Sequence, residues 1–114
     1  MNRNIFTIGA ILLSGFVFSQ EGRVGINTAQ PAATLDVMAS STDLTRTDGF
    51  IAPRLKGSEL QAKDALYTDA QDGTIVYVNE ALTTTTDKTI NVTTIGYYYF
   101  DKTQGTAGRW MKIA

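Results

Sequence analysis

Residues 96–113 read GYYYFDKTQGTAGRWMKI, and this stretch decides the fold class of the chain. Its two ends, Tyr97–Phe100 and Arg109–Ile113, have the aromatic and alternating composition that is typical of β-strands. The segment between them, Asp101–Gly108, is rich in glycine and predicts a turn. Together the three segments predict a terminal β-hairpin.

Further elements are predicted just before this hairpin. Thr74–Val78 follows the turn signal Asp72-Gly73 and is β-branched and aromatic, which predicts a strand buried on both faces. Ser58–Gln61 has the residues of a capping box and predicts a short helix that runs to about Tyr67. After a threonine-rich loop, Thr89–Thr93 alternates in polarity and predicts a weaker strand.

Residues 20–55 have a different composition. Their apolar side chains are sparse and form alternating pairs, Val24 with Ile26 and Leu35 with Val37, which predicts extended β segments. Such a segment cannot enclose a core, so it is either disordered or lies against something else, including copies of itself. The predicted fold is α+β and mostly β, with these extended segments, one short helix and a small antiparallel C-terminal sheet that ends in the hairpin.

The first nineteen residues are predicted to be a secretory signal peptide. Residues 5–18 form a nearly unbroken apolar run after Arg3, and the small residue Ser19 marks the expected cleavage site. The run is shorter than the roughly 17 to 25 residues that span a bilayer, so we expect export to the medium or cell surface and no membrane insertion after cleavage. The predicted divisions are the signal peptide, residues 1–19; an extended stalk segment, residues 20–55; and a small domain, residues 56–114.

The composition excludes most routes to catalysis. The chain has 114 residues without cysteine or histidine, which leaves no thiol nucleophile, no imidazole base, no disulfide and no Cys/His zinc site. Its ten basic and eleven acidic side chains give a net charge of −1, whereas nucleic-acid binding needs a basic surface. Asp64, Asp69 and Asp72 lack the spacing of a calcium loop. We therefore expect no enzymatic activity, metal, cofactor or nucleic-acid partner.

Tyr97, Tyr98, Tyr99 and Trp110 are the candidate ligand-binding residues. On paired strands their rings could form a flat platform for the apolar face of a sugar, because aromatic faces bind such surfaces while their polar tips stay hydrated. Facing aromatic residues also stabilise a hairpin by cross-strand packing, and this is the simpler interpretation. Three consecutive tyrosines send side chains to both faces of a strand, so some of them are expected to be exposed.

Four segments carry a family resemblance: Val24–Val37, which contains VGINT and PAATLDV; Gly49–Leu55, GFIAPRL; Gly73–Val78, GTIVYV; and Gly96–Trp110, which begins GYYYFD. In this order they resemble segments of phage tail-fibre-like proteins, of trimeric surface adhesins and of Bacteroidetes-type secreted surface proteins. The chain departs from that pattern at Asn27, where glycine is more common, and in a longer loop at Leu82–Thr94.

The resemblance implies an extended, trimeric, β-rich stalk that leads into a small terminal domain, and it implies no catalytic residues. Copies that intertwine around a threefold axis would bury the sparse apolar side chains of the stalk. The expected oligomer interface consists of Val24, Ile26, Leu35, Val37, Phe50 and Ile51.

These features predict a secreted or surface-exposed structural and interaction module, a fibre-like trimeric stalk or cap with an adhesive role. Two alternatives remain: a carbohydrate-binding module that uses the C-terminal aromatic residues, and a subunit of an extracellular filament. The expected partners are copies of the chain itself, as a homotrimer or a filament, and a surface glycan or another surface protein.

Overall fold

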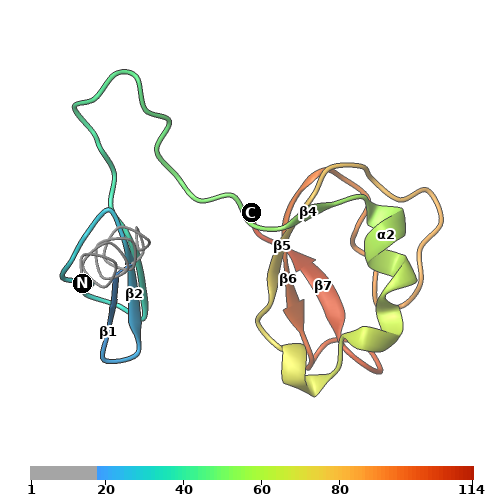
Figure 1. The fold of residues 1–114 in the computed structure, drawn as a ribbon. Helices are drawn as coiled ribbons and strands as arrows, with labels where there is room; N and C mark the ends of the chain where they lie inside the picture. Colours follow the sequence, from blue (N-terminus) through green and yellow to red (C-terminus); the bar gives the residue numbers. More distant parts are fainter. Residues whose placement is uncertain (1–17) are drawn as a thin grey trace, which may run out of the picture. The chain divides into compact units, whose positions relative to one another are not determined.

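The computed structural model describes residues 18–114, and the chain divides into two compact units (Figure 1). The first unit ends at Phe50 and the second comprises Ile51–Ala114. This boundary precedes the predicted one because Arg54–Leu55 forms a strand that pairs with the sheet of the second unit. The α+β, mostly β fold class predicted from the sequence is confirmed.

A three-stranded sheet forms the first unit. Strands β1 (Phe18–Gln20), β2 (Arg23–Ile26) and β3 (Leu35–Val37) lie in that order, with β1 antiparallel to β2 and β2 parallel to β3. Glu21 and Gly22 join β1 to β2 with φ values of 51° and 73°, as in the tight turns of hairpins. Apart from its last two residues, the predicted signal peptide lies outside the described residues.

A left-handed turn at Asn27 redirects the chain after β2. Its φ is 62°, a conformation that glycine and asparagine adopt more readily than other residues. Asn27 Nδ2 donates to the carbonyl oxygen of Met38 at 3.3 Å and to Ser40 Oγ at 3.1 Å. This geometry explains why asparagine can stand where the tail-fibre-like pattern more often has glycine.

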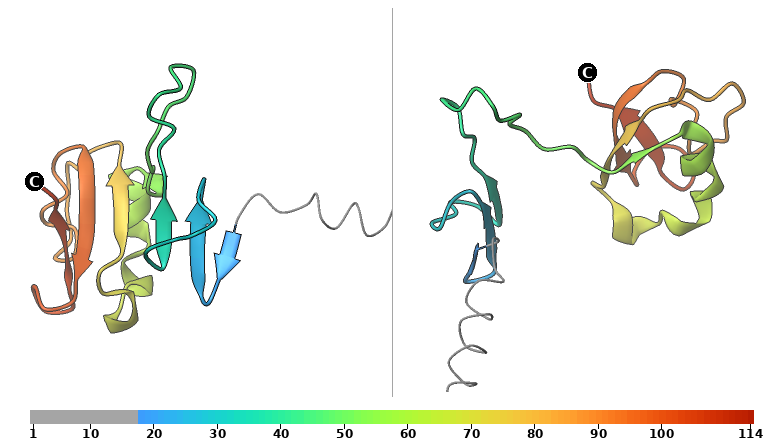
Figure 2. Two further views of the ribbon diagram at one scale, coloured as in Figure 1. Left: turned by 90° about the vertical axis from the view of Figure 1, so that its left-hand side faces the viewer. Right: turned by 45° about the horizontal axis from the view of Figure 1, so that its top comes forward.

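The second unit is a four-stranded mixed sheet with helical turns on one side (Figure 2). Strand β4 (Arg54–Leu55) is parallel to β5 (Ile75–Val78), whereas β5, β6 (Gly96–Asp101) and β7 (Arg109–Lys112) are antiparallel to their neighbours. The sheet is therefore mixed, whereas an antiparallel sheet was predicted. The hairpin β6–β7 is confirmed. The helical elements of this unit are α2 (Gly57–Ala62) and the 3-10 turns η1 (Asp64–Leu66) and η2 (Asp69–Gln71).

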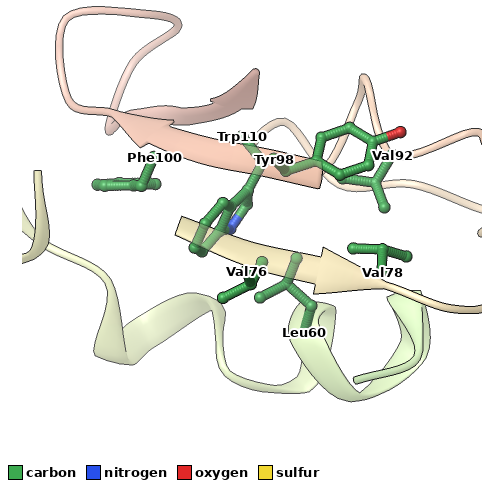
Figure 3. Packing of buried hydrophobic residues seen from close by; sticks show 7 residues of the cluster. All are labelled: Leu60, Val76, Val78, Val92, Tyr98, Phe100 and Trp110. Atoms are coloured by element: carbon green, nitrogen blue, oxygen red, sulfur yellow. The ribbon is translucent and has the colours of Figure 1, made fainter. Parts of the chain in front are cut away.

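The core lies between this sheet and α2; most of its side chains come from alternate strand positions, and Leu60 of α2 and Val92 of the loop before β6 complete it (Figure 3). The Trp110 ring lies at its centre, with centroids 5.3 Å from Phe100 and 4.7 Å from Tyr67. Ile75 is exposed, so β5 is buried on one face rather than on both as predicted. The buried cluster consists of Leu60, Val76, Val78, Val92, Tyr98, Phe100 and Trp110.

The helix begins earlier and ends earlier than its sequence predicts. Its N-cap is Lys56 rather than Ser58, and the backbone N–H of Lys56 donates to Glu59 Oε1 at 2.8 Å. After Ala62 the chain continues in the 3-10 turn η1, up to Leu66. The capping box therefore forms two positions earlier than predicted, with Lys56 and Glu59 in place of Ser58 and Gln61.

The threonine-rich loop is fixed to the rest of the unit by polar contacts. Buried Thr89 donates to Gln61 Oε1 of α2 at 2.6 Å. Lys88 Nζ donates to the carbonyl oxygens of Asp64 at 2.9 Å and Tyr67 at 2.6 Å. The strand predicted at Thr89–Thr93 does not form, because these residues make turns and side-chain contacts instead of a ladder.

Candidate self-association surfaces

The four apolar residues that the sequence singles out in the first unit lie on one face of its sheet. Val24 is opposite Leu35 in the parallel pair, and Ile26 is opposite Val37. Because residues two apart share a face of a strand, all four side chains point to the same side. Ile26, Leu35 and Val37 are 38%, 52% and 40% exposed in the single chain. We call these four residues the stalk face.

The opposite side of the same sheet is covered by its own connection. A Cβ at Gly25 would overlap the backbone of Thr28, so the chain between β2 and β3 lies directly against this side. Asp36 Oδ2 accepts a hydrogen bond from the backbone N–H of Ala32 at 2.9 Å, and Pro31 is buried. The sheet thus has one side that is closed by its own loop and one apolar side that is open to solvent.

Phe50 and Ile51, the other two predicted interface residues, lie in an irregular segment at the unit boundary. Both are 63% exposed, and neither belongs to a strand. Within the second unit, Ile51 lines an open groove of about 380 Å³ together with Arg54, Tyr77 and Tyr97. Phe50 is the last residue of the first unit and lies outside its strands, whereas Ile51 is the first residue of the second unit.

The four aromatic residues predicted as a sugar platform are split between the two sides of the second sheet. Tyr98 and Trp110 are 0% exposed and belong to the core, so they cannot present a face to a ligand. Tyr97 and Tyr99 are exposed on the other side. The four rings do not form one platform, because successive residues of a strand point to opposite sides of the sheet. The cross-strand packing interpretation holds for Trp110, which is paired with Phe100.

A second apolar surface was not predicted and lies on the side of the four-stranded sheet that faces away from α2. In register across β5, β6 and β7, Ile75 is opposite Tyr99 and Tyr99 is opposite Met111. The next row pairs Tyr77 with Tyr97, whose rings meet edge to face at 4.8 Å. We call this surface the outer sheet face. Its residues are Ile75, Tyr77, Tyr97, Tyr99, Met111 and Ile113.

The alternation of Ile75, Tyr77, Tyr97 and Tyr99 with buried neighbours was the signal that could have revealed this surface. Reading Thr74–Val78 as buried on both faces concealed it, because exposed aromatic and β-branched residues have the same composition as buried ones. The missing information is which side of the sheet the helix covers.

Three aspartates accept hydrogen bonds that lower their pKa values. The Arg109 guanidinium donates to the carboxylate of Asp87, and this bond holds the pKa of Asp87 below its ordinary value. Hydrogen bonds from Thr45 and Thr103 likewise lower the pKa values of Asp43 and Asp101. Carboxylates with lowered pKa values are ionised at neutral pH and poorly suited to general acid catalysis.

No group of three or more potential metal-ligating side chains occurs among residues 18–114. Asp72, one of the three aspartates considered for calcium, instead accepts a hydrogen bond from the backbone N–H of Lys102 at 2.9 Å. Gly73 adopts a φ of 86°, as the turn predicted at Asp72-Gly73 requires. Within the described part of the chain, no helix has the length and apolar character needed to cross a membrane.

Comparison with known proteins gives one finding. A family model described as the phage tail like trimerisation region matches residues 23–114, which include both apolar surfaces. A search of the curated proteins and a search of the solved structures each returned no match. Because the matched region spans most of the sequence, the chain belongs to the phage tail like trimerisation region family.

Proposed function

We propose that this protein is exported and acts as a homotrimeric stalk or cap in which the stalk face joins three copies. Membership of a trimerisation family supports self-association as a homotrimer. The observation that carries the choice of surface is the apolar row on one side of the first sheet, in which Val24 is half-buried and Ile26, Leu35 and Val37 are exposed.

The energetics of the first unit favour this role. Among the residues of this unit whose burial is described, only Gly25 and Pro31 are buried, and their small side chains provide almost no core. Full burial of one Leu, Ile or Val side chain contributes roughly 1.5–3 kcal/mol. Moving the four stalk-face residues out of water would therefore stabilise a unit whose described residues bury no large side chain, and association would achieve this.

The native mass of the chain in solution tests this proposal. We expect sedimentation to give a trimer at micromolar concentration. Leu35→Asp should dissociate it, because a carboxylate would be placed within an apolar interface. Leu44→Asp is the matched control, since Leu44 is 97% exposed and lies outside both sheets. A monomeric parent chain, or a Leu35→Asp variant that remains as trimeric as the Leu44→Asp control, would contradict the proposal.

Export and an adhesive role are further parts of the proposal, and the N-terminal sequence supports the first. Sequencing of the protein recovered outside the cell is expected to begin at Gln20, and retention inside the cell would count against export.

For the carbohydrate-binding alternative, Tyr97→Ala is the informative variant, since it removes an exposed ring without disturbing the core. Sedimentation at rising concentration distinguishes a discrete trimer from the filament alternative.

A further inference from the structure

We infer that the outer sheet face is a second self-association surface, which packs against the second unit of a neighbouring copy. This inference rests on the proposed trimer and adds a contact within it. It concerns the six residues Ile75, Tyr77, Tyr97, Tyr99, Met111 and Ile113, and it assigns a role to the exposed tyrosines.

Both sides of the four-stranded sheet carry apolar and aromatic side chains, but only the inner side is covered. Val76, Val78 and Tyr98 on the inner side are buried beneath α2. Ile75, on the outer side, is 48% exposed, and none of the described elements of this unit covers it. A contiguous exposed apolar patch on a folded unit is typical of a surface that contacts another molecule.

The composition of the outer sheet face favours a protein partner. Its central rows contain tyrosine, isoleucine and methionine, and aromatic residues and methionine are enriched at the centres of protein interfaces, where charges are depleted. Charged residues lie at its ends: Arg54 on β4 is opposite Tyr77 and lines the groove, and Asp101 is opposite Arg109. This arrangement resembles the apolar centre and polar rim of an interface.

The edges of the sheet are poorly suited to receive a strand, so contact through the face is favoured. Along β7, the N–H of Trp110 donates to the carbonyl oxygen of Lys88 at 2.9 Å, and Asn91 Nδ2 donates to the carbonyl oxygen of Trp110 at 3.0 Å. At the other edge, β4 has two residues and follows Pro53, which has no N–H to donate. These edges argue against growth of a filament by strand addition.

A second copy is the occupant that the family assignment supports. The match to the phage tail like trimerisation region extends from residue 23 to residue 114, so it includes the whole second unit and not only the stalk face. If the stalk faces alone made the trimer, three apolar outer sheet faces would remain in water. Contact between second units would remove them from solvent, at about 25 cal/mol for each Å² of apolar surface buried.

Lysine substitution of one exposed residue on each side of the second unit tests the inference. In the full chain, Ile75→Lys should weaken association about tenfold or more, because it places a charge in the buried contact. Leu66→Lys is the matched control, since Leu66 is 65% exposed and lies in η1 on the helical side. Far-UV circular dichroism should show that both variants remain folded.

A cysteine label provides an independent measurement, because the natural chain has no cysteine. We expect Tyr99→Cys to react with a maleimide more slowly in the trimer than in the Leu35→Asp background, and Thr84→Cys in the exposed loop to react equally fast in both. A trimeric parent with equal effects of Ile75→Lys and Leu66→Lys, and with no protection at position 99, would overturn this inference and leave the stalk-face trimer intact. A monomeric parent would overturn both.

Discussion

The two units of this chain achieve stability in opposite ways. The second unit buries a tryptophan, a phenylalanine and a tyrosine between a sheet and a short helix, and all the large buried hydrophobic residues of the described chain belong to it. The described part of the first unit forms three strands, but Ile26, Leu35 and Val37 on them are exposed. A chain segment can therefore form strands without burying a hydrophobic core. Such a segment depends on contact with another surface for the burial of its apolar side chains.

The largest expected effect is the loss of the core of the second unit. Trp110→Ala removes the central ring, and large-to-small changes of this kind cost about 3–5 kcal/mol of unfolding free energy. Urea unfolding followed by far-UV circular dichroism measures it, with Trp110→Phe as the milder control. An unchanged unfolding midpoint would contradict the central role of Trp110 in the stability of the second unit.

A substitution in the turn of the hairpin is expected to have the next largest effect. Gly108 has a φ of 91°, and a Cβ there would overlap the Phe100 ring. Gly108→Ala should cost about 2–4 kcal/mol, from backbone strain and overpacking together. Gly73→Ala is the control, since Gly73 has a φ of 86° but open space around it, and should cost about 1–2 kcal/mol. Equal losses in urea unfolding would show that the Phe100 contact is unimportant.

A substitution in the first unit should act only locally. Asn27→Ala combines a left-handed backbone with the loss of two side-chain hydrogen bonds, at about 1–2 kcal/mol. Hydrogen exchange should quicken at the Val24 and Met38 amides, which are bonded across the β2–β3 region, and not at the Phe100 amide. Asn27→Gly keeps the backbone conformation and should show a smaller change. Faster exchange at Phe100 would show that the two units unfold together.

The smallest expected effect is the response to acid. Because the pKa of Asp87 is lowered in the folded state, its contribution to stability is present above the unfolded pKa of about 4 and is lost as the pH falls through the lower folded value. The stability of the parent should therefore decrease below about pH 4, and Asp87→Asn should decrease less steeply. Parallel curves for the two proteins in pH-dependent thermal unfolding would exclude a role for the Asp87–Arg109 pair.

The sequence predicted the elements that depend on local patterns. Three predicted features are present: the C-terminal hairpin, the strand that ends at Val78, and the short strands around Val24 and Leu35. Each of them is determined locally, by the spacing of apolar side chains and by turn residues. The common face of the four stalk residues also follows from this period once β2 and β3 pair in register.

Other features depend on contacts between distant segments and were missed. Strand β4 has only two residues, and its parallel pairing with β5 cannot be recognised from so short a pattern. The strand predicted at Thr89–Thr93 is replaced by turns because Thr89 bonds to Gln61, a residue far away in sequence. Similarly, the burial of Tyr98 and the exposure of Tyr97 and Tyr99 depend on which side of the sheet α2 covers.

The anchored threonine-rich loop has a consequence for how this chain can change in length. Although this loop lies at the surface, Lys88 is hydrogen-bonded to η1, Thr89 to α2 and Asn91 to β7. Inserted residues would disturb these hydrogen bonds. The exposed segment 41–49 has mainly local hydrogen bonds and no strand. A peptide tag or a longer spacer should therefore be accepted between Ser41 and Gly49, and changes in the length of the chain are most readily accommodated there.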